Sequence, residues 1–564
     1  MKYCNWDIGG FDRDVAVEFC RDGVNPLVSV LLASRGITEI EAAHAIISDS
    51  FETLHDPFLM ADMDKAVVRI SDAVNKGEKI AVFGDYDVDG MTSTTILILW
   101  LRSQGADFDY YIPGRAENNG YGLNSSALDT MKADGIKLVI TVDCGITAIE
   151  ETTYATSIGL DLVITDHHEC RAELPDAIAV INPKRKDCKY PDKALAGVGV
   201  AFKLVCALEN DYQSDYIFDK YGELVAVGTV ADVMPVSGEN RTLIRRGINT
   251  IRKHPSPGLL SLLHATGTEP GKINSSTIGF ILAPRLNAAG RMGQPNLSVK
   301  LLLAKDSNEA QGYAAELCRL NSERRDLEAK IYEEAVTMYS DFDSDSPIII
   351  AGHSWHQGVT GIVASKMADQ HHVPVVIISI DEDGVGRGSC RSIGRFDIYE
   401  SISSCEDILD NYGGHNKAAG ITITEKNIDE FRRRICEHYR NNIGNLQAFG
   451  LELDFEVEKP ELLTIENIEA LCCLEPFGHD NPSPRLCMRG AKVCGAQSIG
   501  AGKHSRLKIE KAGKSLDCIF FSVPAEQLGV CEGMLVDVAF EPQVNEFRGR
   551  SSVQLQLCDI RAAE

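Results

Sequence analysis

The sequence of 564 residues has no uninterrupted apolar run of the roughly 20 residues that a membrane-spanning helix needs. Residues 1–7 lack the apolar segment of a secretory signal peptide. No low-complexity tract is present, and no two of the 17 cysteines have C-x-x-C spacing. The odd cysteine count and the missing pairs argue against a disulfide framework and against a zinc site. These absences predict a cytoplasmic protein with reduced thiols and no membrane partner.

An excess of basic residues is missing as well, since the formal net charge is −26. That charge argues against a non-specific binder of polyanions. It does not exclude a local basic groove, because phosphate contacts depend on local charge. What the chain does have is length and apolar content, with 44% hydrophobic and 24% charged residues. By length it comprises roughly three or four domains with substantial cores.

The most informative stretch is Asp85-Tyr-Asp87-Val-Asp89-Gly90, which lies between the apolar runs 80–83 and 96–100. This order predicts a buried strand, an acidic loop and a helix. On an extended segment, carboxylates at alternate positions fall on one face. Their mutual repulsion is relieved by a cation, and hard oxygen donors suit Mg²⁺ or Mn²⁺. The alternative is a solvated acidic turn.

In two later segments an apolar run is again followed by side chains that can bind a metal. The apolar run 138–142 ends at Asp143, and the run 162–165 ends at Asp166-His167-His168, with helical patterns between the runs. Strands that end in metal-competent side chains predict a doubly wound parallel sheet with its ligands at the carboxyl edge. A fourth segment, 224–233, is an apolar helix-like run with one acid, Asp232, which is costly to bury unless it is paired or binds a metal.

These four segments, Asp85–Gly90, Asp143–Gly145, Asp166–His168 and Gly228–Asp232, resemble the four motifs of the DHH phosphoesterase superfamily. The RecJ-type single-stranded-DNA-specific exonucleases are the more similar branch, because further motifs resemble theirs at residues 285–292, 355–365, 386–392, 413–415, 474–478 and 545–549. The resemblance implies a catalytic α/β domain, a connecting helix that holds two domains apart, a second α/β (DHHA1) domain and an OB-fold barrel.

Sequence patterns and the resemblance together predict five parts of the chain. They are an N-terminal helical segment that packs or acts as a lid (1–60), a DHH domain (61–250), a helical region (251–340), a DHHA1 domain (341–445) and an OB-fold domain (450–564). Apolar spacing predicts one long helix over 307–340, and residues 38–42 predict a helix capped by Thr38. Strands are expected at 347–350 and 374–379. Alternation at 506–510 and 552–557 predicts a small antiparallel barrel. Glycines 384, 386 and 388 are interpreted as positions where a ligand approaches the backbone.

By resemblance, the chain degrades single-stranded DNA from its 5′ end to mononucleotides in DNA repair and recombination, with two Mn²⁺ or Mg²⁺ ions. The predicted metal ligands are Asp85, Asp87, Asp89, Asp143, His167, His168 and Asp232, with Asp143 bridging and Asp166 orienting a histidine. Asp143, His167 and His415 are the predicted catalytic residues. The predicted substrate-binding residues are Arg115, Asn287, Arg291, Arg387, Ser389, Arg391, Gly414 and His415. Some superfamily members have histidine where this chain has Phe83, which leaves open which first-motif acid binds which ion.

Two other functions stay open. One is a DHH enzyme that cleaves cyclic dinucleotides or very short RNA, and the other is a non-catalytic replication scaffold. A monomer is expected, and the resemblance implies a helicase and a single-strand-binding protein as partners. Basic residues of the barrel region (Lys503, Arg506, Lys508, Arg548 and Arg550, with Phe547 for stacking) either follow a single strand or are solvated. Residues 321–325 are likewise either a solvated helix face or a basic patch.

Overall fold

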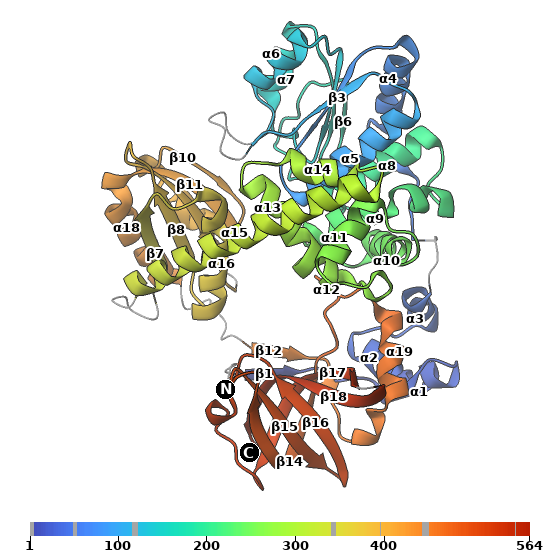
Figure 1. The fold of residues 1–564 in the computed structure, drawn as a ribbon, viewed down its shortest axis with the longest axis vertical. Coiled ribbons are helices and arrows are strands. Elements are labelled where there is room, and N and C mark those ends of the chain that lie inside the picture. The colour runs from blue at the N-terminus through green and yellow to red at the C-terminus, as the bar shows by residue number, and fades with distance from the viewer. Residues whose placement is uncertain are drawn as a thin grey trace. The chain divides into compact units, whose positions relative to one another are not determined.

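The computed structural model describes residues 5–48, 53–114, 122–339, 346–394, 396–442, 450–547 and 549–563 (Figure 1). The chain forms two compact units. One comprises Phe51–Gln447, and the other combines Met1–Ser50 with Ala448–Glu564. Among the described residues, no helix has the length and apolar character to cross a bilayer. None of the cysteines that the structure describes forms a disulfide bond with another.

The larger unit begins with a parallel five-stranded sheet of order β3-β2-β4-β5-β6. The strands are β2 (Ile80–Gly84), β3 (Phe108–Tyr111), β4 (Leu138–Val142), β5 (Asp161–Thr165) and β6 (Ala179–Ile181). The chain passes from β2 to β3 on one side, and then continues with β4 on the other side of β2. The strand order therefore reverses at β2 and β4, which is where open α/β sheets bind their ligands.

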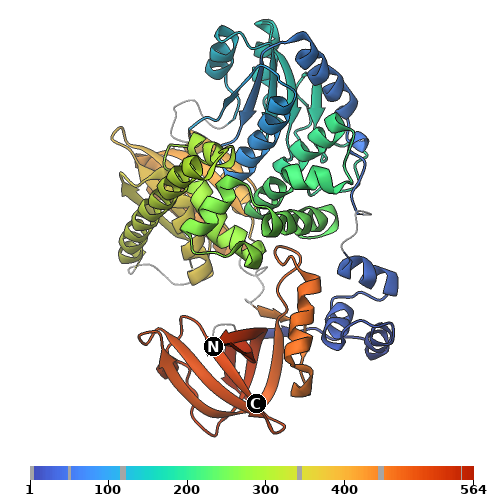
Figure 2. The ribbon, with the colours of Figure 1, turned by 45° about the vertical axis from the view of Figure 1, so that its right-hand side comes forward.

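Helices cover both faces of this sheet (Figures 1 and 2). They are α4 (Met63–Lys76), α5 (Val88–Ser103), α6 (Ser125–Ala133), α7 (Ile149–Ser157), α8 (Gly197–Glu209) and α9 (Asp215–Ala231). Every residue of β2 and β4 is buried, as expected for parallel strands covered on both faces. The predicted doubly wound parallel sheet is confirmed.

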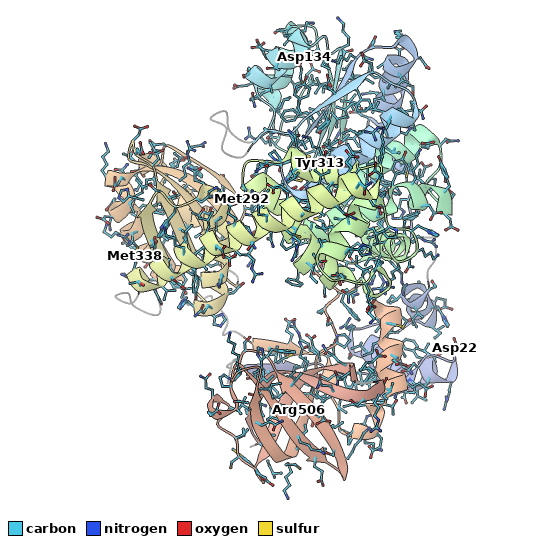
Figure 3. All side chains as sticks on the ribbon, in the orientation of Figure 1. Asp22, Asp134, Met292, Tyr313, Met338 and Arg506 are labelled. Atoms are coloured by element: carbon cyan, nitrogen blue, oxygen red, sulfur yellow. The ribbon has the colours of Figure 1, made fainter. Side chains whose placement is uncertain are left out.

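A helical region follows, consisting of α10 (Gly238–Lys253), α11 (Pro257–Ala265), α12 (Ser275–Thr277), the π-helical turn η3 (Ile278–Leu282), α13 (Ala283–Arg291) and α14 (Asn296–Leu302). The predicted long helix is confirmed as α15 (Ser307–Tyr339), which carries Tyr313 and Met338 (Figure 3). In its middle, Asn321 and Arg324 are buried while Arg325 is exposed. Arg324 donates from Nη1 to Glu328 Oε2 at 2.9 Å, so residues 321–325 are only partly a solvated face.

The second sheet has the order β10-β11-β9-β8-β7, and only the pair β7 and β8 is parallel. Its strands are β7 (Ile348–His353), β8 (Val375–Ile380), β9 (Val385–Arg391), β10 (Asn411–Gly414) and β11 (Ala418–Thr424). Its helices are α16 (Gln357–His371), α17 (Ile398–Ser403) and α18 (Ile428–Asn442). The strands predicted at 347–350 and 374–379 are present.

The smaller unit contains a closed five-stranded barrel, because β14 pairs with both β15 and β17. The ring consists of β14 (Leu486–Ile499), β15 (His504–Lys511), β16 (Lys514–Phe520), β18 (Arg550–Ala562) and β17 (Leu535–Phe547). The short strand β13 (Phe455–Glu456) pairs with β14 outside this ring. Arg506 lies on β15 (Figure 3) and contacts Asp517 Oδ1 at 3.4 Å. The predicted barrel is confirmed, although β16 and β18 pair in parallel.

Residues from the N-terminus pack in the same unit. Strand β1 (Asn5–Ile8) pairs with β12 (Gly450–Leu453), and helices α1 (Arg13–Arg21), α2 (Pro26–Ser34) and α3 (Ile40–Ile47) share a hydrophobic cluster with the barrel. Helix α19 (Ile465–Ala470) contacts α2. The prediction that Thr38 caps α3 is wrong, because the capping position is Glu39 and no side-chain hydrogen bond closes that end.

Candidate metal centre

The acidic loop after β2 turns directly into helix α5. Asp87 caps this helix, since its Oδ1 accepts a hydrogen bond from the Gly90 amide at 3.1 Å, and Asp89 lies in the first turn. The predicted extended segment is therefore wrong: an aspartate that can cap starts the helix at Val88. A Cβ on Gly90 would lie 2.5 Å from the carbonyl oxygen of Asp85, so only glycine allows this tight turn.

Asp89 is held by the start of a distant helix. Its two carboxylate oxygens accept hydrogen bonds from the backbone amides of Gly197 and Val198, both at 2.7 Å. These amides belong to the first turn of α8, where the helix dipole favours negative charge. Burial nevertheless raises the pKa of Asp89 well above its usual value, with a further contribution from the charge of Asp232.

Asp143 follows the end of β4 and is buried. Its backbone has φ of 59°, in the left-handed region that Asp and Asn tolerate better than most residues. A Cβ added to Gly197 would lie 2.6 Å from Asp143 Oδ1, so the start of α8 rests directly on this carboxylate. Burial and the charge of Asp89 raise the pKa of Asp143.

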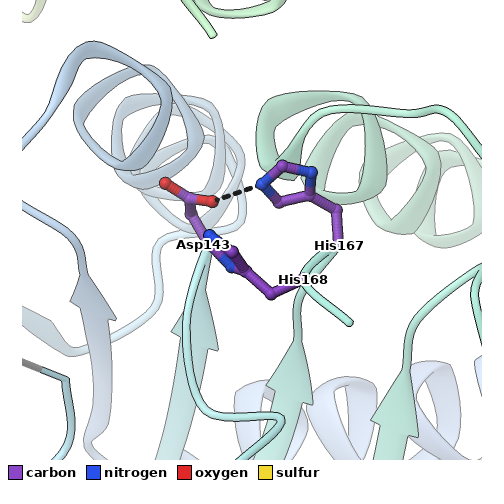
Figure 4. A group of neighbouring side chains, drawn as sticks. All are labelled: Asp143, His167 and His168. Atoms are coloured by element: carbon purple, nitrogen blue, oxygen red, sulfur yellow. Dashed lines mark ion pairs between the residues drawn. The ribbon is translucent and has the colours of Figure 1, made fainter. Parts of the chain in front are cut away.

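The segment after β5 contains two histidines, His167 and His168, whose pKa values are shifted in opposite directions. His167 Nε2 lies 3.1 Å from Asp143 Oδ1 (Figure 4), and burial, assisted by His168, lowers the pKa of His167 to about 3. Burial alone would lower the pKa of His168, but its hydrogen bond with Asp166 raises that pKa to about 9. Neutral His167 is in the form that binds a metal.

Asp166 accepts hydrogen bonds from backbone amides and contacts His168. Its Oδ2 accepts from the Ile146 amide at 2.9 Å, and its Oδ1 lies 2.7 Å from both the His167 amide and His168 Nδ1. Although burial opposes ionisation, the hydrogen bond with His168 holds the pKa of Asp166 below its usual value. This geometry suits a carboxylate that orients His168 rather than one that binds an ion.

The ligand atoms gather into three overlapping groups, within each of which they lie no more than 4.8 Å apart. The groups are Asp143, His167 and His168; Asp89, His167 and Asp232; and Asp85, Asp87 and Asp143. Asp143 and His167 each belong to two groups. His167 Nε2 lies 3.6 Å from Asp232 Oδ2 and 3.8 Å from Asp89 Oδ2. Burial and the charge of Asp87 raise the pKa of Asp232 to about 7. Clustered carboxylates with imidazole fit a hard or borderline divalent cation such as Mn²⁺ or Mg²⁺.

Two predicted substrate residues on α13 have structural partners. Asn287 Oδ1 accepts a hydrogen bond from the Val88 amide at 3.1 Å, which ties α13 to the acidic loop. Arg291 Nη1 donates to the Gly358 carbonyl at 3.0 Å, next to the start of α16. These two side chains therefore connect the metal cluster, α13 and the second α/β domain.

On β9, Arg387, Ser389 and Arg391 alternate along one face and all contact α16. Arg387 Nη1 donates to Gln357 Oε1 at 3.3 Å, Ser389 Oγ lies 3.2 Å from Thr360 Oγ1, and Arg391 Nε donates to Ser365 Oγ at 3.1 Å. Gly414 has φ of 142°, and exposed His415 follows it. Arg115 lies outside the described residues.

The interpretation of glycines 384, 386 and 388 as points of ligand approach is wrong for the two that lie on β9, Gly386 and Gly388. A Cβ on Gly388 would lie 2.6 Å from Ile421, and a Cβ on Gly386 would lie 2.9 Å from Ile378. Both face the buried side of the sheet, opposite Arg387, Ser389 and Arg391. Their absent side chains make room for isoleucines of the neighbouring strands.

The sequence reasoning missed Gly197, Val198, Thr360 and Ser365. The first two supply the amides that hold Asp89, and the other two hold Ser389 and Arg391. Gly197-Val198-Gly199 opening an apolar run was the available signal for a helix start that approaches another group closely. Thr360 and Ser365 lie in the motif at residues 355–365, but no role was predicted for either.

Family models match most of this architecture. Residues 79–229 match the DHH family N-terminal domain, 345–441 the DHHA1 domain and 453–559 the RecJ OB domain. The single-stranded-DNA-specific exonuclease RecJ of Bacillus subtilis (strain 168) is 38% identical over 563 residues, covering 99% of this chain and 71% of the relative. The chain belongs to the RecJ family.

Other members of the family agree with this assignment. RecJ of Escherichia coli (strain K12) is 33% identical over 561 residues, covering 95% of this chain and 96% of the relative. The crystal structure of RecJ from Thermus thermophilus in complex with Mn²⁺ has a TM-score of 0.84 and 28% identity, covering 99% of this chain and 80% of that one. The T. thermophilus protein has also been crystallised with Mg²⁺.

We expect Mn²⁺ to raise the melting temperature, and to do so more at pH 8 than at pH 6. Without metal, Asp232 has a pKa of about 7, above the roughly 3.9 of an unfolded aspartate. The folded protein therefore holds an extra proton between these values, and metal-free stability falls as pH rises through them. Ion binding needs the ionised carboxylates and so strengthens with pH. Thermal melts with Mn²⁺ and with EDTA at both pH values test this, and an equal Mn²⁺ increment at both would contradict it.

Proposed function

We propose that this chain is a metal-dependent exonuclease that degrades single-stranded DNA in the 5′ to 3′ direction and releases 5′-mononucleotides. The observation that carries the proposal is the set of three overlapping ligand groups that share Asp143 and His167, in a chain of the RecJ family. A scaffold that had lost its ligands would not keep such a cluster, which costs stability without a cation. Relatives named as exonucleases match nearly the whole chain.

In this proposal Asp89, His167 and Asp232 would hold one divalent ion and Asp85 and Asp87 the second, with His168 completing the set and Asp143, which belongs to two of the ligand groups, as the shared carboxylate. Two such ions supply an activated water and charge stabilisation for an in-line displacement at phosphorus. The amides of Gly197 and Val198 hold the Asp89 carboxylate in place and favour its ionised form against the effect of burial, and Asp166 holds the ring of His168 in one orientation.

In the same proposal, residues of the second α/β domain and of α13 bind the substrate phosphates. His415, beside Gly414, binds the scissile phosphate and stabilises its developing charge. Asn287, Arg291 and Arg387 contact the sugar-phosphate backbone of the DNA strand. Arg115, Ser389 and Arg391 bind the terminal 5′ phosphate, for which the planar arginine fork is suited. Recognition of that end fixes the distance to the first scissile bond and so favours mononucleotide release.

One substrate panel tests the function. Single-stranded DNA with a 5′ label, a blunt duplex and a cyclic dinucleotide are each incubated with Mn²⁺ and with EDTA. We expect only the single strand with Mn²⁺ to be degraded, with labelled mononucleotide as the first product. Long labelled fragments would contradict the polarity. Cleavage of the cyclic dinucleotide alone would favour a small-substrate enzyme, and no cleavage of any substrate would favour a scaffold.

The wild type should prefer a 5′ phosphate over a 5′ hydroxyl, and Arg391→Ala or Arg115→Ala should lose most of that preference while still cleaving. A bidentate arginine contact to phosphate, with about 1.5–3 kcal/mol for a charged hydrogen bond, corresponds to roughly a tenfold or larger preference. The measurement is kcat/KM on matched oligonucleotides. Arg433→Ala, on the exposed face of α18, is the control. An unchanged preference in both variants would show that neither arginine binds the 5′ end.

The proposal also covers the setting. It places the enzyme in the cytoplasm, acting as a monomer in DNA repair and recombination, where a helicase and a single-strand-binding protein would supply its substrate. The lack of disulfide bonds among the described cysteines is compatible with that reducing compartment.

A further inference from the structure

The metal cluster has buried members and members that solvent reaches. The side chains of Asp89, Asp143 and His167 are 1%, 3% and 7% exposed, whereas that of Asp232 is 27% exposed. A substrate phosphate can therefore reach the cluster beside Asp232, which caps the end of helix α9. His168, at 37%, is exposed as well. The residues around the end of α9 are thus candidates for contact with the substrate.

Val233, the next residue, is unusual in two respects. It has φ of 56°, a conformation that is a genuine outlier for a β-branched residue. Its side chain is 68% exposed, so burial in the core does not compensate for the strain. Strained residues of this kind cluster at sites that bind ligands.

Phe280 is the second exposed apolar side chain near this point. At 81% it is the most exposed large hydrophobic residue in the part of the chain that the structure describes. It lies in the π-helical turn η3, within the continuous helical run 275–291. Single π-helical turns of this kind are often found at functional sites.

Contacts place this turn against the end of α9. A Cβ on Gly279, the neighbour of Phe280, would lie 3.7 Å from Val230 Cγ1, and Val230 is two residues before Asp232. The Val233 amide donates to the Val230 carbonyl at 3.2 Å. Further along the same helical run, about two turns after Phe280, Asn287 contacts the acidic loop. The turn that carries Phe280 therefore packs against the end of α9, where Asp232 and Val233 follow.

We infer that Val233 and Phe280 bind an unpaired base of the DNA strand next to the metal centre, with the base stacked on the Phe280 ring and packed against Val233. This inference rests on the proposed function. Aromatic side chains accept any base by stacking, which suits an enzyme without sequence preference. A base inside a duplex is already stacked on both faces, so this contact also favours single strands.

The test combines abasic substrates with variants. Single-stranded oligonucleotides carry one abasic position at each of the first six nucleotides in turn, and KM and kcat are measured with Mn²⁺. For the wild type we expect one or two adjacent abasic positions to raise KM by roughly tenfold, in line with the loss of one stacked base. Phe280→Ala should raise KM for intact DNA by a similar factor and show no further effect of the abasic position. Phe280→Trp should keep the wild-type pattern.

Val233→Gly separates the binding role from folding. Glycine adopts positive φ without strain. The melting temperature of the Val233→Gly protein should therefore equal or exceed that of the wild type, while its KM rises. Phe58→Ala and Val68→Ala, at exposed positions on η1 (Pro57–Leu59) and α4, are the controls and should leave KM unchanged. If the wild type shows no abasic effect, or if Phe280→Ala retains it, the inference is wrong. A wild type that fails to cleave intact single strands refutes the proposed function itself.

Discussion

Asp143→Asn should abolish cleavage of single-stranded DNA, with kcat in Mn²⁺ falling by at least about a thousandfold. Asp143 is the carboxylate common to two of the ligand groups and lies 3.1 Å from His167. Losing it removes several kcal/mol of metal-dependent stabilisation of the transition state, and each 1.36 kcal/mol corresponds to about tenfold in rate. Asparagine is the substitution of choice because it tolerates φ of 59° much as aspartate does.

The same variant should be at least as stable as the wild type when metal is removed. Burial and the charge of Asp89 raise the pKa of Asp143, which shows that ionising this group is unfavourable in the metal-free fold. Removing one charge should raise the free energy of unfolding in EDTA by on the order of 1 kcal/mol. Asp326→Asn, an exposed change on α15, serves as the control in both assays. A purified Asp143→Asn protein with wild-type kcat would show that the two-ion assignment is wrong.

Lys203→Met should destabilise the larger unit by about 3–5 kcal/mol, because it leaves a buried carboxylate without its counter-charge. The side chains of Lys203, on α8, and Glu239, on α10, are both 0% exposed and form an ion pair. Lys203 Nζ also donates to the His55 carbonyl at 2.8 Å, and the His55 amide donates to Glu239 Oε1 at 3.0 Å. Tyr190 OH donates to the other oxygen of Glu239.

Thermal and denaturant unfolding, compared with the wild type, measure this effect. The double variant Lys203→Met with Glu239→Gln should recover part of the loss, because it removes the uncompensated charge. Lys76→Met is the matched control, since its pair with Asp72 is exposed and such surface pairs add little to stability. A Lys203→Met protein within about 1 kcal/mol of the wild type would contradict the idea that this pair clamps residue 55 to α8 and α10.

Local pattern was enough to predict much of this protein. The apolar runs before Asp85, Asp143 and Asp166 are strands β2, β4 and β5. A parallel strand that is buried on both faces consists of consecutive apolar residues, so a local run is enough to predict it. Their carboxyl ends meet at one edge, so the acids and histidines that follow them were expected to converge, and the structure brings them together. The periodicity of α15 and the alternation in β15 and β18 are local signals of the same kind.

Tertiary structure decided what depends on residues far apart in the chain. The amides that hold Asp89 come from α8, more than 100 residues later. Asp87 caps a helix rather than extending a strand, because the packing of Gly90 against Asp85 permits the turn. Glycines 386 and 388 make room for core isoleucines of neighbouring strands, which no local pattern reveals. The strand near the N-terminus, β1, pairs with β12, more than 400 residues away. Such contacts form only when elements pack, so their partners cannot be deduced from the periodicity of either segment.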